Sequence, residues 1–434
     1  MHEVGELTGW AYAIITVLKV GVAFVVVLLT VAMLTLLERK IAAWIQDRLG
    51  PNRVGPSGLL QPFADGLKNF AKEETNPGAA SRVFFWIAPM IALTPAFVVF
   101  AIVPFAAPLP TPWGVVDMIV ADVPVGILFL LALASLGVYG IVMAGWSSNN
   151  KYAFLGALRA SAQMVSYEVG LGMSLIPVFI LAGNVTLTHI VWTQQEELGV
   201  WLAFPLGLAF VLFVISALAE TNRLPFDVAE AESELVSGYH TEYSSMKFSM
   251  FFMAEYANLL TSAALMATLF FGGWDIPFFT FDNMRVIAPG VVMGAEPAVW
   301  KTLLTFLAFV LKTFFFIFMF MWIRWTVPRF RYDQIMHLGW KVVLPSALAF
   351  IVVISTSVLV LEGLGLPYGV LYGLILTAVN LVCMALFFWL VDRDRVIGGS
   401  YGTEKVRALR AGRMPRGVSV EPAPMRPAAT ATNK

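Results

Sequence analysis

The stretch from Glu220 to Glu255 reads ETNRLPFDVAEAESELVSGYHTEYSSMKFSMFFMAE and lies between two long apolar runs. It holds seven acidic residues and only two basic ones, Arg223 and Lys247, in a chain where charged residues make up 13% of the total. Because a bare charge in hydrocarbon is costly, carboxylates this dense beside apolar runs need a reason. Carboxyl groups held away from water can exchange protons near neutral pH. The simpler alternative is a solvated loop.

The composition of the whole chain indicates a membrane protein. Hydrophobic residues make up 59% of the sequence and the mean hydropathy is +0.79. The charged fraction is about half that of a typical soluble domain. The formal net charge is zero, so nothing in the charge balance indicates a nucleic-acid partner.

The cysteine and histidine content excludes several kinds of redox site. The single cysteine, Cys383, lies inside an apolar run, which excludes a disulfide framework and an iron–sulfur cluster held by this chain. None of the four histidines lies in the middle of an apolar run, where a haem would need it. There is also no metal-ligand spacing, no Walker loop and no dinucleotide fingerprint.

Apolar runs of sufficient length predict an all-α polytopic fold. A membrane-spanning helix needs about 20 apolar residues, and on this criterion we expect about nine spans. They cover residues 11–37, 83–105, 122–146, 163–183, 200–219, 248–272, 301–325, 341–361 and 368–391. We therefore expect residues 1–397 to form a transmembrane domain, with residues 398–434 as a disordered tail rich in Ala, Pro, Arg and Thr.

The distribution of Lys and Arg predicts the orientation. Basic residues are frequent in the loops after spans 1, 3, 5 and 7 and in the C-terminal tail, and they are nearly absent from the other loops. Arg285 is a mild exception. The positive-inside rule therefore puts the N-terminus outside and the C-terminus in the cytoplasm. We expect an integral protein of a bacterial cytoplasmic (inner) membrane.

The first cytoplasmic loop, residues 38–82, contains a helical pattern of its own. Gly and Pro residues punctuate its first half as turns. Apolar side chains then recur at helical spacing through residues 59–71, with Asp65 and Lys68 on other sides. The pattern predicts an amphipathic helix in the membrane interface, either a passive anchor or one wall of a cavity open to lipid.

Three ionisable residues lie within the predicted spans, namely Glu168, Glu255 and Lys312. Each costs about 2.5–3.5 kcal/mol at the middle of a helix on insertion scales, so each is a candidate functional residue. A purely structural alternative is that they pair with one another across the helix bundle.

The acidic stretch itself, residues 220–247, offers further candidates. Glu220, Arg223 and Asp227 would share a face of a continuing helix, but a proline at position 225 favours presentation by turns. Glu230 and Glu234 are four residues apart, and such a like-charged pair favours one proton held between two groups.

Five long blocks in these regions resemble the H-type membrane subunit of proton-pumping NADH:quinone oxidoreductase, respiratory complex I. The resemblance covers about residues 11–361, so it excludes span 9 and the tail. The blocks are ERKIAAWIQDRLGPNRVGP (38–56), LQPFADGLKNFAKEE (60–74), SSNNKYAFLGALRASAQMVSYE (147–168), AETNRLPFDVAEAESELVSGYHTEYSSMKF (219–248) and RWTVPRFRYDQIMHLGWK (324–341).

The resemblance implies tilted helices at the heel of a membrane arm and a chain with no redox centre of its own. FMN and the iron–sulfur clusters would reside on partner subunits, and quinone would be the substrate. The implied partners are the peripheral-arm subunits that carry the terminal iron–sulfur cluster, small and antiporter-like membrane subunits, and membrane lipid.

The resemblance also implies roles for particular residues. Arg39, Arg48, Asp65 and Arg223 would line or shape a quinone chamber. The implied proton and coupling path consists of Glu168, Glu220, Asp227, Glu230, Glu232, Glu234 and Glu255.

Two other functions remain open at this point. A homologous subunit of an ion-pumping membrane-bound hydrogenase-type complex would share most of these blocks, although the block from Arg39 to Asp65 favours quinone. A secondary ion transporter would show an inverted repeat and a broken helix at the midplane, and the sequence shows neither.

Overall fold

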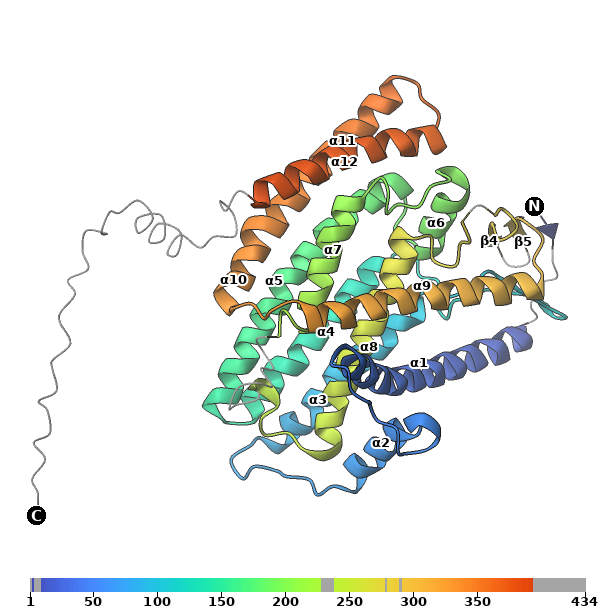
Figure 1. Ribbon diagram of the computed structural model, residues 1–434. Helices are drawn as coiled ribbons and strands as arrows, with labels where there is room; N and C mark the ends of the chain where they lie inside the picture. The colour runs from blue at the N-terminus through green and yellow to red at the C-terminus, as the bar shows by residue number, and fades with distance from the viewer. Residues whose placement is uncertain (1, 4–8, 228–237, 278, 289–290, 393–434) are drawn as a thin grey trace, which may run out of the picture. The chain divides into compact units, whose positions relative to one another are not determined.

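The computed structural model describes residues 2–3, 9–227, 238–277, 279–288 and 291–392. Among these residues, eight helices are long and apolar enough to cross a membrane. The chain is therefore an all-α polytopic membrane protein, as the sequence predicts (Figure 1). Glu230, Glu232, Glu234 and the tail 398–434 lie outside the described residues.

The eight long apolar segments correspond to eight of the nine predicted spans. Two of them include short irregular turns, since α3 continues into a 3-10 turn, and α10 runs through a π turn into α11. The helices that form these segments are α1 (Gly9–Ile45), α3 (Arg82–Val98), α4 (Gly126–Ser147), α5 (Lys151–Ala182), α8 (Ser245–Phe270), α9 (Val299–Thr326), α10 (Tyr332–Leu338), α11 (Leu344–Gly363) and α12 (Val370–Asp392).

The predicted span 200–219 is shorter than expected. Its regular helix, α7 (Gly207–Glu220), has 14 residues, fewer than the ~20 that a full crossing needs. Pro205 lacks the N–H that a regular helix would use, so the residues before α7 form turns. Helical hydrogen bonds still connect them, because Leu206 N donates to Leu202 O at 2.9 Å and Phe210 N to Leu206 O at 2.9 Å.

The remaining helical elements are short. The interfacial helix predicted at residues 59–71 is α2 (Gln61–Ala71), and it packs against α1 and α8 (Figure 1). The others are η1 (Pro56–Gly58), η2 (Val99–Ile102), α6 (Leu187–Trp192), η3 (Thr193–Glu197), η4 (Gly238–His240) and η5 (Gly339–Val343).

Two small antiparallel sheets lie in the connections between helices. In the first, β5 (Val291–Gly294) lies between β1 (His2–Glu3) and β4 (Met284–Ala288), with Val292 opposite both His2 and Val286. The second pairs β2 (Leu109–Thr111) with β3 (Gly114–Val116), with Leu109 opposite Val116.

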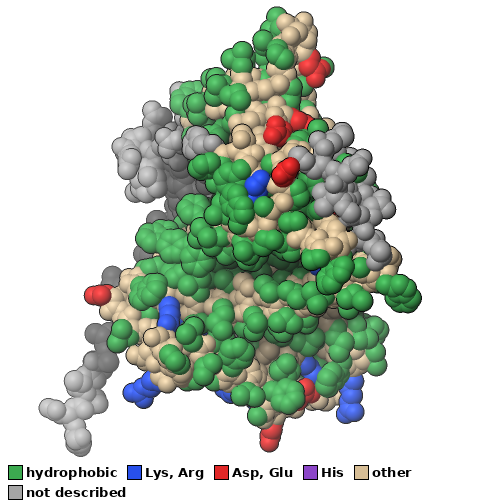
Figure 2. Space-filling view, turned by 90° about the vertical axis from the view of Figure 1, so that its right-hand side faces the viewer, with side chains coloured by type: hydrophobic (Ala, Val, Ile, Leu, Met, Phe, Trp, Pro, Cys, Tyr) green, Lys and Arg blue, Asp and Glu red, His purple; other side chains and the backbone are tan. Residues whose placement is uncertain are grey.

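Helix α8 is the centre of the bundle. Inside the structure, 67% of its apolar window is buried, against 22% for α1 and 11% for α12. Helices α1, α3 and α9 pack against it. Its neighbours' outward sides carry exposed apolar residues, and Figure 2 shows one face on which hydrophobic side chains predominate, with most of the visible Lys and Arg toward the lower edge.

Helix α5 begins well before the apolar run predicted at residues 163–183. Asn150 caps it, accepting a hydrogen bond from Tyr152 N at 2.9 Å, and Gly183 ends it in the left-handed conformation. The connection expected before residue 163 is therefore helical from Lys151 onward, because local capping rather than hydropathy sets where a helix starts.

Candidate functional site

A tight turn after α7 holds Arg223. The buried amide of Gln163, on α5, donates to three acceptors of this turn, namely Ala219 O at 2.9 Å, Asn222 Oδ1 at 3.2 Å and Phe226 O at 2.8 Å. The turn thus has little freedom to move, and it directs Arg223 into the protein, where only 2% of the residue is exposed.

The Arg223 guanidinium pairs with two carboxylates from two other helices. Its Nη1 donates to Glu38 Oε2 on α1 at 2.7 Å. Its Nε lies 2.8 Å from Glu255 Oε1 on α8. Since a buried charge without a partner is strongly destabilising, these pairs explain how three charged side chains can share an apolar bundle.

Two more side chains complete the cluster around Glu38. Tyr256 donates its hydroxyl to Glu38 Oε2 at 2.8 Å, and its ring lies 4.2 Å from the Arg223 guanidinium carbon. Arg324, near the end of α9, donates to Glu38 Oε1. We call the five residues Glu38, Arg223, Glu255, Tyr256 and Arg324 the charge cluster.

The charge cluster has hydrogen-bonding capacity left over. Within the described residues, Arg223 Nη2 and Arg324 Nε are buried without a hydrogen-bond partner. Asp227 is also buried, and its charge interacts with that of Glu255. Two guanidinium groups with free donors in a site of low polarity can attract a group that becomes negatively charged.

A cavity of about 40 Å³ connects the charge cluster to a further acid. Its walls include both Glu255 and Glu220, together with Asn222 and Asn258. Both carboxyl residues keep some accessible surface, and both border this cavity. A polar cavity needs only about 10–15 Å³ to hold a water molecule, so this one has room for water between the two acids.

Glu168 continues the series of acids on α5. It accepts a hydrogen bond from Ser135 on α4, and its charge interacts with that of Glu220. The structure therefore brings four predicted path residues into one connected region with the predicted chamber residue Arg223. The four are Glu168, Glu220, Asp227 and Glu255.

The other predicted chamber residues lie at the cytoplasmic-loop end of α1. Arg39 Nη1 pairs with Asp65 Oδ2 on α2 at 2.6 Å, which fixes α2 to the helix that also carries Glu38. Arg48 stands apart from this pair, since it is exposed and its Nε donates to Gln46 Oε1 at 2.7 Å.

The predicted mutual pairing of Glu168, Glu255 and Lys312 does not occur. Lys312 instead donates to the backbone oxygens of Phe271 at 2.6 Å and Asp275 at 2.5 Å, and it lies 4.5 Å from the Trp201 ring. Each of the three charges therefore has a partner of its own.

Sequence reasoning missed Glu38, Tyr256 and Arg324 as site residues. A usable signal existed, because Glu38 and Arg324 begin two of the five blocks and both follow apolar runs. Charged residues in such positions need an opposite charge, so the two could have been proposed as partners. No group of three or more His, Cys, Asp or Glu arranged to hold a metal ion occurs in the described part of the chain.

Lys247 also lies in the acidic stretch, but it has a structural position. Only 2% of it is exposed, and it pairs with Asn76 at 2.5 Å and Glu74 at 3.3 Å while lying 3.9 Å from the Trp86 ring. It thereby connects the segment after α2 to the start of α8.

The fold and the charge cluster together define a class of protein, a polytopic membrane protein with paired charges buried among its spanning helices. A family model described as NADH dehydrogenase matches residues 18–355. The chain belongs to this NADH dehydrogenase family, and the predicted assignment to an oxidoreductase is thereby confirmed.

Several relatives, all H-type subunits of NADH-quinone oxidoreductase by name, are similar over most of their length. The second such protein of Geobacter metallireducens is 52% identical over 354 residues, which cover 79% of this chain and 95% of the relative. The first of Geobacter sulfurreducens is 52% identical over 353 residues, covering 79% and 94%. The first of Geobacter metallireducens is 48% identical over 335 residues, covering 77% and 94%.

Proposed function

We propose that this chain is a membrane subunit of proton-pumping NADH:quinone oxidoreductase that forms part of the quinone chamber and couples quinone reduction to proton translocation. The observation that carries the proposal is the connected series of membrane-embedded acids from Glu38 through Glu255 and Glu220 to Glu168. The names of the Geobacter relatives support the same assignment.

The proposed chamber lies where α1, α2 and the turn after α7 meet. Arg39 and Asp65 hold α2 against α1, and Arg223 approaches from the other side through Glu38, the neighbour of Arg39 in the sequence. Arg48 would shape the exposed rim. Helix α2 carries exposed apolar side chains, including Leu67 at 72% and Phe70 at 76%, which would contact lipid at the entrance.

The charge cluster would respond to quinone reduction through electrostatics. Reduction adds electrons to the quinone and requires protons, so negative charge develops beside the chamber. The unpartnered N–H groups of Arg223 and Arg324 would turn toward that charge. Any loosening of their pairs with Glu38 and Glu255 changes the protonation of these carboxyls, because an opposite charge favours the ionised form.

Protons would then pass along the acids. Water in the cavity of about 40 Å³ would carry a proton between Glu255 and Glu220, and Glu220 would exchange it with Glu168. Asp227, whose charge interacts with that of Glu255, would connect this path to the acidic segment. The acids of that segment are Glu230, Glu232 and Glu234.

The remaining components of the enzyme belong to other chains under this proposal. FMN, the iron–sulfur clusters and the NADH site would lie on peripheral subunits that dock over the chamber. Small and antiporter-like membrane subunits would receive the signal from Glu168. The complex would reside in the bacterial inner membrane, with the C-terminus in the cytoplasm.

The test replaces single path acids in the assembled complex. Glu168→Gln and Glu220→Gln keep the shape of the side chain but remove its exchangeable proton. We expect NADH oxidation by a hydrophilic artificial acceptor to persist, while quinone reduction and proton pumping fall by at least about tenfold. Glu362→Gln, which alters an exposed acid at the end of α11, serves as the matched control and should leave all three rates unchanged.

Unchanged pumping in both Glu168→Gln and Glu220→Gln would contradict the path. Loss of NADH oxidation with the artificial acceptor would show that the complex had not assembled, and the amount of each subunit in the purified complex distinguishes this case.

A further inference from the structure

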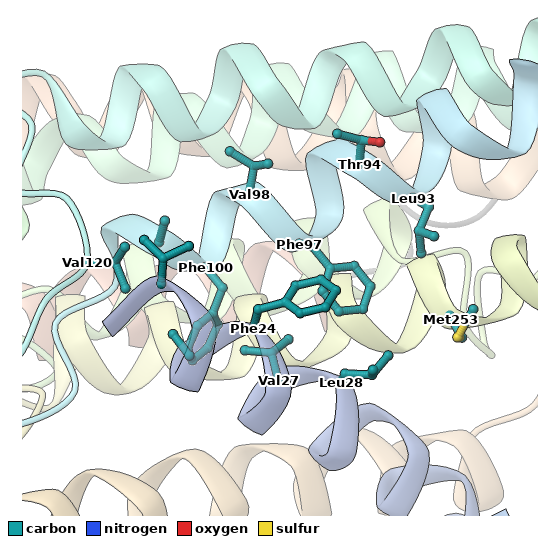
Figure 3. A pocket seen from close by; sticks show the side chains of 13 residues that line it. Phe24, Val27, Leu28, Leu93, Thr94, Phe97, Val98, Phe100, Val120 and Met253 are labelled. Carbon is teal, nitrogen blue, oxygen red and sulfur yellow. The ribbon is translucent and has the colours of Figure 1, made fainter. Parts of the chain in front are cut away.

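An apolar groove of about 450 Å³ runs between α1, α3 and α8 (Figure 3). Thr94 is the one polar residue among the described residues that line it. The side chains that matter for its shape are Phe24, Val27, Leu28, Leu93, Phe97 and Met253.

The groove is separate from the charge cluster. None of the described residues in its lining is charged, and Leu28 precedes Glu38 on α1 by about 15 Å along the helix axis. The groove also opens outward, since Val20 is 49% exposed and Phe24 is 53% exposed. Because these helices cross the membrane, the opening faces lipid, and a hydrocarbon chain matches its lining.

An ammonium group lies at one end of this groove. Lys19 Nζ donates to Asp117 O at 3.2 Å and to Ile119 O at 2.9 Å. Lys19 is the sequence neighbour of Val20, and Ile119 that of Val120, both of which line the groove. An ammonium has three N–H bonds, so one donor remains for an anionic group at this end.

Lys19 also lies at the depth where a lipid headgroup begins. The apolar part of α1 between Lys19 and Glu38 is about 27 Å long at 1.5 Å per residue, close to the ~30 Å hydrocarbon thickness of a bilayer. The groove therefore starts at the membrane boundary and runs inward.

A carboxyl group accompanies the ammonium. The half-buried Asp117 interacts electrostatically with Lys19. A nearby carboxylate opposes the binding of a purely anionic headgroup, whereas a headgroup that carries both a phosphate and an ammonium matches the pair.

We propose that this groove is a specific site for a zwitterionic phospholipid of the phosphatidylethanolamine type. One acyl chain lies along Phe24, Leu93 and Phe97, the phosphate accepts a hydrogen bond from Lys19, and the headgroup ammonium faces Asp117. This site is additional to the proposed quinone chamber and does not depend on it.

The first experiment tests the groove. The intact complex is reconstituted with phosphatidylethanolamine that carries a photoactivatable group in its acyl chain, and cross-linked peptides are identified by mass spectrometry. We expect labelling of the α3 segment that contains Leu93 and Phe97. Val20→Trp, inside the groove, should abolish this labelling. Val22→Trp, on a residue of the same type and similar exposure (54%) outside the groove, should not.

The second experiment tests the headgroup. Lys19→Gln should weaken the competition of unlabelled phosphatidylethanolamine for the site by about tenfold, because a charge-assisted hydrogen bond is lost. Phosphatidylglycerol should compete poorly with the unaltered protein.

Three outcomes would overturn the proposal. They are equal labelling of every exposed helix face, equal competition by both phospholipids, and displacement of the probe by a long-tailed quinone rather than by phospholipid. The last would identify the groove as a quinone site.

Discussion

Arg223 and Arg39 show how burial decides what an ion pair contributes. The two pairs have nearly the same length, 2.7 Å for Arg223–Glu38 and 2.6 Å for Arg39–Asp65. The side chains of the first pair are 2% and 6% exposed, but those of the second are 48% and 23% exposed. Water screens the second pair, whereas the first has no alternative partners in the solvent.

Replacing each arginine by methionine tests this difference. Arg223→Met leaves Glu38 and Glu255 without their shared partner, so we expect a loss of about 3–5 kcal/mol of stability. Arg39→Met should cost less than about 1 kcal/mol. The thermal unfolding midpoint of the purified complex measures both effects. Equal shifts for the two variants would contradict the assigned difference in burial.

His240 predicts a pH dependence. It lies outside the membrane-spanning helices, and burial lowers its pKa to about 4. The unfolded chain takes up a proton near the usual histidine pKa of about 6.5, while the folded chain stays neutral until about pH 4. The stability contribution is therefore fully present above about pH 6.5 and decreases as the pH falls toward about 4.

His240→Gln tests this expectation, because glutamine does not titrate in this range. The thermal midpoint of the unaltered complex should fall by several degrees between about pH 7 and pH 5, and part of that fall should disappear in the variant. An identical pH profile for the two proteins would show that His240 does not contribute.

At the level of secondary structure, the acidic stretch is attached to α5 through two glycines. A Cβ on Gly156 would lie 2.7 Å from the Gly238 Cα, and Gly238 has a positive φ of 65°. Only a residue without a side chain permits this approach of η4 to α5. The contact thus fixes where the acidic segment returns to the bundle.

Two alanine substitutions on α5 test the close approach. Gly156→Ala should displace η4, cost about 1–3 kcal/mol of stability and lower quinone reduction. Gly172→Ala is the control, because its nearest neighbour would be 3.9 Å away, and alanine favours a helix by up to about 1 kcal/mol. Thermal midpoints and quinone reductase rates measure the outcome. A tolerated Gly156→Ala would show that η4 can shift without consequence.

For the chain as a whole, the expected membrane orientation follows from where the charges gather. The long apolar helices leave basic residues at one set of connections, around Asn52 for example, and few at the other, around the exposed Trp113. Under the positive-inside rule these two positions lie on opposite sides of the membrane.

Single-cysteine labelling tests this orientation, since the chain has one native cysteine. In a Cys383→Ser background, Asn52→Cys should react with a membrane-impermeant maleimide only in inside-out vesicles. Trp113→Cys should react only in right-side-out vesicles. Labelling of both positions from the same side would overturn the predicted topology.

The class of fold and the family could be predicted from the residues alone. Apolar runs of about 20 residues are a local signal, and they specified the spans wherever no proline intervened. The signal failed at α7, where Pro205 delays the regular helix, and at α5, where the Asn150 cap starts the helix early. Five sequence blocks were sufficient to identify the family.

Which charges meet could be learned from the packed helices and in no other way. Glu38 and Arg324 are 286 residues apart in the sequence, and Glu38 and Tyr256 are 218 apart, so no spacing rule connects them. Pairing follows from helix packing, which brings α1, α8, α9 and the turn after α7 together around one buried guanidinium. A charge inside the bilayer must find an opposite charge, and the fold determines which one is within reach.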